Sequence, residues 1–107
     1  MSGGFEDRRK GQEAKWAHDE ELRFKVMARR NKLLGLWAAD QKGLSGEAAQ
    51  AYAKEVVAAD LEEAGDEDVY RKVRADLPAA VSDHIIRRQM QTLLSDAAEQ
   101  IEREAKK

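Results

Sequence analysis

Residues 13–40 contain no proline and only one glycine, Gly35. Apolar side chains recur along them at spacings of three, four and seven residues, which is the period of one face of an α-helix. The members of this apolar strip are Leu22, Val26, Met27, Leu33, Leu34, Trp37 and Ala38. So wide a strip predicts a long helix against which the rest of the chain packs.

Composition supports an all-helical domain. The chain has 107 residues, enough for one domain with a modest core, and 37% of them are charged. One proline and seven glycines interrupt long runs of Ala, Glu, Lys, Leu and Arg, which is typical of helical proteins. The formal charge of -2 argues against general affinity for nucleic acid, which needs a basic surface.

The chain contains no cysteine. This excludes disulfides, thiolate nucleophiles and cysteine-bound zinc, and it is compatible with a reducing cytosol. No apolar run approaches the ~20 residues of a membrane span, and the N-terminus lacks the apolar segment of a secretory signal. We therefore expect a cytoplasmic protein without direct membrane insertion.

Capping signals divide the chain into four helices. Gly43 is expected to stop the first helix, Ser45 and Asp66 to cap the second and third, and Ser82 to cap the fourth beyond the break at Pro78. The expected helices cover about 19–41, 45–63, 66–77 and 82–101. Because the connections are short, we predict an all-α four-helix bundle.

The first residues differ from the rest of the chain. Residues 1–15 carry both charge signs and almost no apolar surface, too little to offset the entropy lost on ordering. We therefore predict a flexible N-terminal arm, residues 1–17, followed by a bundle domain, residues 18–107.

Charges of opposite sign are segregated along the chain. The run RFKVMARRNK holds Arg23, Lys25, Arg29, Arg30 and Lys32 without an acid, whereas DLEEAGDED, at 60–68, is acidic. A charged run on a helix is usually a solvated face. The basic side chains could instead bind an acidic partner surface, fold against the chain's own acidic run, or contact nucleic acid. The sequence leaves these possibilities open.

The usual signs of an enzyme or a metal site are missing from the sequence. The acidic run fails as a calcium loop, because Ala64 and Arg71 stand at its fifth and twelfth positions. The two histidines, His18 and His84, lack the spaced partners of a zinc or general-base site, so a hydrogen-bonded structural role is favoured. No phosphate-binding loop or nucleophile elbow occurs. We expect no enzyme activity, cofactor or metal.

Four motifs carry a resemblance to a known family. They are F-x-D-R at 5–8, AHDEE at 17–21, ARRNKLLGLWAA at 28–39 and GDEDV at 65–69. In this order they resemble the zeta-subunit family of alphaproteobacterial ATP synthase inhibitors. The resemblance covers nearly the whole chain and implies a four-helix bundle that blocks ATP hydrolysis.

The resemblance also implies a binding mode. An N-terminal segment of the family is thought to enter a catalytic interface between the alpha and beta subunits, near gamma. The residues that this assigns to partner binding are Phe5, Asp7, Arg8, Glu13, Lys15, Trp16 and His18. The implied partner is the catalytic head of the F-type ATP synthase. No nucleic-acid partner is expected, and the free protein is expected to be a monomer. The alternative is a small helical nucleic-acid-binding or regulatory protein that uses the basic face of the first helix.

The arm provides a first prediction at Gly11, which with Gln12 stands where a more helix-prone, apolar pair is expected for the family. If the arm is helical when bound, Gly11→Ala should lower the dissociation constant from ATP synthase about two- to fivefold. The reason is that alanine gains about 0.5 to 1 kcal/mol over glycine inside a helix. Inhibition titrations measure this, and weaker inhibition by a folded variant would mean that Gly11 is needed for a bend or a close backbone approach.

Overall fold

The computed structural model describes residues 16, 18–62 and 66–105, except for the side chains of 61 and 62. It contains four helices, α2 (Glu20–Gln41), α3 (Gly46–Glu62), α4 (Asp66–Asp76) and α5 (Asp83–Ala105). The described residues form no strand, so the predicted all-α bundle is confirmed. Most of the predicted arm lies outside the described residues.

The ends of α2 and the start of α5 follow local capping signals. The caps expected at Ser45 and Asp66 differ, because the Ser45 side chain makes no hydrogen bond among the described residues, and Asp66 is the first residue of α4 and binds Arg30. Asp19 caps α2, since its carboxylate accepts a hydrogen bond from the Leu22 amide at 3.1 Å, and the Ser82 hydroxyl accepts one from the Ile85 amide at 3.1 Å. At the other end of α2, Gly43 adopts a left-handed conformation with φ of 79°. The Leu44 amide then donates to the Ala39 carbonyl at 2.8 Å, which ends the helix in a Schellman motif.

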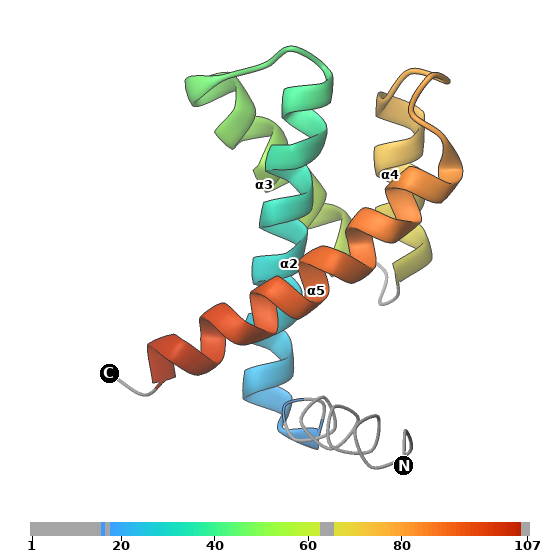
Figure 1. Cartoon of the computed structure of the whole chain (residues 1–107). Coiled ribbons are helices and arrows are strands. Elements are labelled where there is room, and N and C mark those ends of the chain that lie inside the picture. Colours follow the sequence, from blue (N-terminus) through green and yellow to red (C-terminus); the bar gives the residue numbers. More distant parts are fainter. Residues whose placement is uncertain (1–15, 17, 63–65, 106–107) are drawn as a thin grey trace.

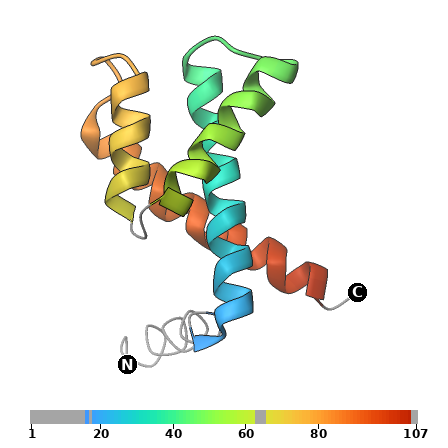
Figure 2. The ribbon, with the colours of Figure 1, turned by 180° about the vertical axis from the view of Figure 1, so that it is seen from behind.

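Helix α2 lies at the centre of the molecule (Figure 1). It packs most extensively against α3, which returns alongside it, and against α5, which crosses it at a steep angle. Helix α4 bridges α3 and the first half of α5, and the view from behind shows the same arrangement (Figure 2). The last helix therefore crosses the bundle instead of running antiparallel to its neighbours.

The buried apolar residues form two clusters. The main core joins all four helices and consists of Leu34, Ala38, Ala39, Tyr52, Val56, Val69, Val73, Leu77, Ile86 and Met90. The second cluster joins the first half of α2 to the last half of α5, with Val26, Ala97 and Ile101 buried and Trp16, Leu22, Leu33, Leu94 and Ala98 packed around them. The apolar strips predicted on α2 and α5 thus supply both clusters.

Gly35 marks the closest approach of α2 to α3. A Cβ atom placed on Gly35 would lie 2.6 Å from the Ala53 Cα and 3.1 Å from its Cβ, well inside van der Waals contact. Since the nearest atom belongs to the backbone of α3, no side-chain rotation could relieve this clash. The absence of a side chain at position 35 is therefore what allows the two helices to pack at this distance.

We predict that Gly35→Ala destabilises the protein. A glycine-to-alanine change normally strengthens a helix by about 0.5 to 1 kcal/mol, but here α3 must move, and overpacking costs about 1 to 3 kcal/mol. Chemical denaturation should therefore show a lower free energy of unfolding. A variant more stable than the parent chain would mean that α2 and α3 can move apart without a loss of packing energy.

Candidate partner-binding site

Two of the seven residues assigned to partner binding are described, Trp16 and His18. Trp16 is half-buried and packs against the second cluster. His18 is exposed, two residues further on. The other five, Phe5, Asp7, Arg8, Glu13 and Lys15, lie outside the described residues.

Within the described residues, neither histidine shows the hydrogen-bonded structural role expected from the sequence. His18 and His84 are both exposed, and neither makes a hydrogen bond within the described part of the chain. His84 lies in the first turn of α5, where the imidazole projects from the surface.

Helix α5 covers one side of the base of the arm. Its Ile101 and Ala97 pack with Val26 of α2 in the cluster that includes Trp16. Polar contacts border this cluster, since Arg29 donates to Gln100 at 2.7 Å and to Glu104 at 3.0 Å. The last turns of α5 thus fix the position of Trp16.

The interpretation of the basic run as a solvated face is wrong for Arg30. Its side chain is only 1% exposed, and its Nε donates to the Asn31 side chain at 2.8 Å. One terminal nitrogen forms an ion pair with Asp66 at 2.7 Å. This arginine therefore folds against the chain's own acidic run and ties α2 to the start of α4.

A signal in the sequence could have revealed the burial of Arg30. It stands four residues after Val26 and four before Leu34, so it falls within the apolar strip of α2. Both neighbours in the strip are fully buried. A lone charge at such a position predicts a buried ion pair better than a solvated one.

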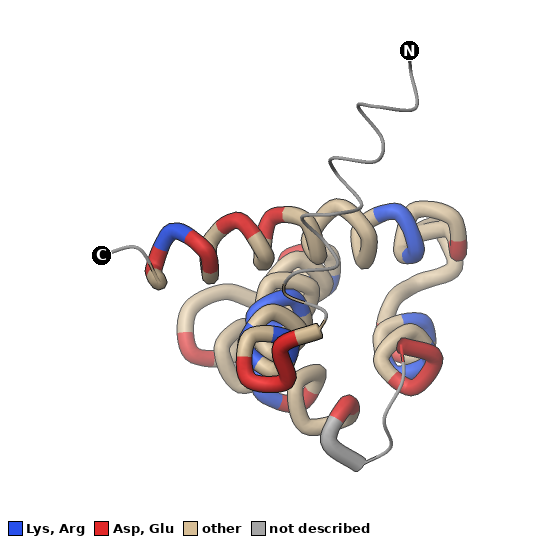
Figure 3. The backbone as a smooth tube through the Cα atoms, turned by 90° about the horizontal axis from the view of Figure 1, so that it is seen from below, with Lys and Arg blue, Asp and Glu red and all other residues tan. Residues whose placement is uncertain are grey.

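The remaining basic residues of α2 offer little free charge to a partner. Arg29 is paired with Glu104, and Lys25 lies 3.5 Å from Glu21. Only Arg23 and Lys32 of this run lack an ion pair among the described residues. Figure 3 shows acidic and basic residues side by side on the helices. This pattern disfavours the nucleic-acid alternative, which requires a continuous basic surface.

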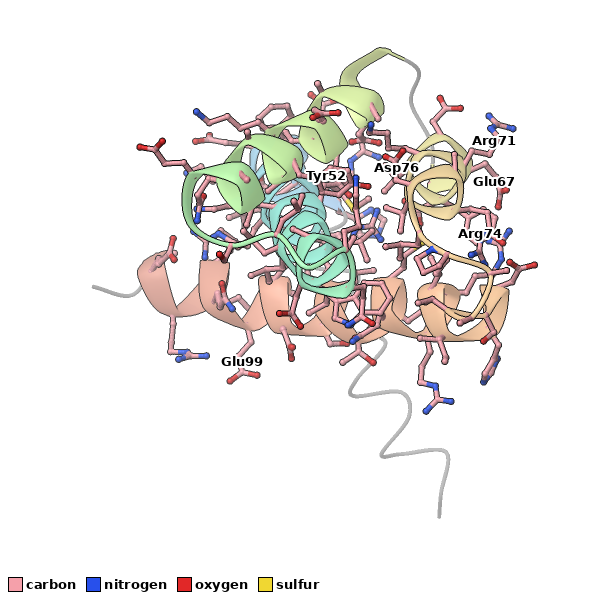
Figure 4. All side chains as sticks on the ribbon, turned by 90° about the horizontal axis from the view of Figure 1, so that it is seen from above. Tyr52, Glu67, Arg71, Arg74, Asp76 and Glu99 are labelled. Atoms are coloured by element: carbon pink, nitrogen blue, oxygen red, sulfur yellow. The ribbon has the colours of Figure 1, made fainter. Side chains whose placement is uncertain are left out.

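A second polar network joins α3 to α4 and is drawn in Figure 4, where Tyr52 and Asp76 face each other. The Tyr52 hydroxyl donates to Asp76 at 2.9 Å, and Lys72 lies 2.9 Å from both Asp76 and Glu55. Burial and the hydrogen bond to Asp76 raise the pKa of Tyr52. The network cross-links two helices and leaves no side chain free to act as an acid or base.

Asp76 makes this network sensitive to acid. Burial opposes ionisation of its carboxyl group, but hydrogen bonds from Lys72 and Tyr52 outweigh burial and lower its pKa. The ionised Asp76 carboxylate therefore makes its full contribution to the stability of the fold above the pKa that an aspartate has in the unfolded chain, about 3.9. This stabilisation is lost as the pH falls through the lower folded pKa.

The described residues provide no metal site and no membrane span. They contain no group of three or more His, Asp or Glu side chains placed to hold a metal ion. None of the four helices is both long enough and apolar enough to cross a bilayer. The described part of the molecule is thus a helical bundle whose polar networks join its own helices.

Comparison with known proteins identifies the family. A family model described as ATPase inhibitor subunit zeta matches residues 1–100. A protein solved by solution NMR is 49% identical and superposes with a TM-score of 0.72, covering 78% of this chain and 98% of the other. No curated protein matches.

The chain belongs to the ATPase inhibitor subunit zeta family. This confirms the resemblance carried by the four sequence motifs. The protein is accordingly a regulatory protein with an inhibitory role at ATP synthase, and not an enzyme.

The buried Arg30 provides a prediction that compares two neighbouring acids at the start of α4. Asp66→Ala leaves the buried guanidinium without its carboxylate, which should lower the free energy of unfolding by about 1 to 3 kcal/mol. Glu67→Ala is the matched control, because it removes a first-turn acid whose partner, Arg87, is exposed, and should cost less than about 1 kcal/mol. Equal losses in denaturant titrations would show that the Arg30 pair adds no stability.

Proposed function

We propose that the chain inhibits ATP hydrolysis by inserting its N-terminal arm, residues 1–17, into a catalytic interface between the alpha and beta subunits of ATP synthase, near gamma. The observation that carries the proposal is the family match, which starts at residue 1 and includes the whole arm. The folded helices remain outside the interface. They act as a body too large to follow the arm inward.

The charges of the bundle support this division of labour. Arg30 is buried against Asp66. Three further basic residues each pair with a carboxylate of another helix, namely Arg29, Lys72 and Arg74. A surface whose charges are neutralised internally has little to offer as the main source of affinity. We therefore assign the main binding energy to a segment outside these networks.

The length and composition of the arm suit insertion. Residues 1–17 would extend about 25 Å as an α-helix, which is enough to reach into an interface between subunits. A segment that orders on binding can bury a large surface even when it lacks the apolar residues to fold alone. Trp16 and Phe5 are its aromatic residues, and buried aromatic side chains often dominate binding energy.

The proposed complex forms at the membrane-bound ATP synthase. The partner is the catalytic head of the F-type enzyme, reached from the cytoplasmic side, so the protein is peripheral to the membrane. The contacts within the arm are assigned to Phe5, Asp7, Arg8, Glu13, Lys15, Trp16 and His18. The free protein is a monomer.

Deletion of residues 1–15 tests the proposal. We expect inhibition of ATP hydrolysis to be abolished while thermal unfolding and helical circular dichroism of the bundle are retained, because both buried clusters lie beyond residue 15. The deletion keeps Trp16 so that the second cluster is not disturbed.

A matched control replaces residues 1–15 with a Gly-Ser segment of equal length. It should also fail to inhibit, because the bulk of a tail alone cannot substitute for the side chains of the arm. Full inhibition by either variant would contradict insertion of the arm. Loss of helicity in the bundle would instead show that the arm is part of the fold.

A further inference from the structure

Phe24 is the most exposed large apolar side chain of the described residues, with 64% of its surface accessible. It lies in the second turn of α2, about 6 Å along the helix axis from the first residue, Glu20. Phe24 lies outside the apolar strip that the sequence predicts for α2. Exposure of a phenyl ring to water is unfavourable, so a partner that covered the ring would gain free energy of binding.

The position of Phe24 on α2 shows which side of the helix it occupies. It lies eleven residues before Gly35, which is buried where α2 meets α3, and this spacing of about three turns keeps both residues on the same face. Helix α3 ends at Glu62, and Phe24 remains exposed. Together with the half-buried Met27 and Ala28, Phe24 forms an apolar surface that continues this side of α2 toward the arm.

The opposite side of the same turns is already covered. Leu22 and Val26 are each two residues from Phe24, and two residues turn a helix by about 200°. Both belong to the cluster that packs under α5. A surface that meets the first turns of α2 from the side opposite α5 would therefore contact Phe24.

We propose that Phe24, with Met27 and Ala28, is a second contact with the catalytic head of ATP synthase, and that its ring enters an apolar pocket beside the mouth of the arm's binding site. The inference rests on the proposed function for the position of that mouth. Continuity along the chain supports this partner, because Phe24 lies five residues after Asp19 and eight after Trp16. An enzyme surface that receives the arm as far as Trp16 must therefore lie within about two helical turns of Phe24.

The test compares Phe24→Ser with Ile85→Ser in the full chain. Ile85 is the other exposed large apolar residue, 41% accessible, and it lies in the first turn of α5, away from the first turns of α2 (Figure 1). Phe24→Ser should weaken binding to the purified catalytic head about 10- to 100-fold, the range of a buried aromatic anchor. Ile85→Ser should leave it unchanged. Both variants should unfold at the parent temperature, since neither side chain is buried.

Each other outcome overturns the inference. Unchanged binding by Phe24→Ser shows that the ring meets nothing on the enzyme. Tighter binding shows that the ring holds the chain's own arm in the free protein. A parent chain that is dimeric by sedimentation, with a monomeric Phe24→Ser variant that inhibits normally, assigns this face to a second copy. The proposed function is judged separately, because it fails only if the chain lacking residues 1–15 still inhibits.

Discussion

The close approach of two backbones at Gly35 and Ala53 is the constraint on which the other contacts depend. A side chain at position 35 would collide with the α3 backbone, so its absence sets the distance between α2 and α3. That distance in turn places Tyr52 and Val56 of α3 in the main core and brings Tyr52 within hydrogen-bonding range of Asp76 on α4. One missing Cβ atom thus fixes the positions of three helices.

Helix α2 serves two purposes on its two sides. Toward α3 and α4 it contributes Leu34, Ala38 and the buried Arg30, whose pairing with Asp66 leaves none of the charge of that guanidinium for a partner. Toward α5 it contributes Val26 and the contacts that hold Trp16. Because these groups are used internally, many charges of the bundle stabilise its own fold. This agrees with the proposal that the arm provides the affinity for the enzyme.

The sequence predicted the elements better than their packing. Helix boundaries near Asp19, Gly43 and Ser82 depend on local hydrogen bonds and backbone conformation, which a short stretch of sequence specifies. The burial of Arg30 and the crossing of α2 by α5 depend on residues far apart in the chain, and a run of charges looks the same whether or not a distant carboxylate covers it. The arm residues were assigned to partner binding from the family resemblance alone, because neither periodicity nor spacing specifies contacts with another protein.

The separation of the two apolar clusters has a consequence for dynamics. The second cluster is built from α2, the last half of α5 and Trp16, and it shares none of its residues with the main core. Such a unit can open and close at a lower free energy than global unfolding. The contact of Trp16 with the last turns of α5 can therefore open locally while the main core keeps its fold.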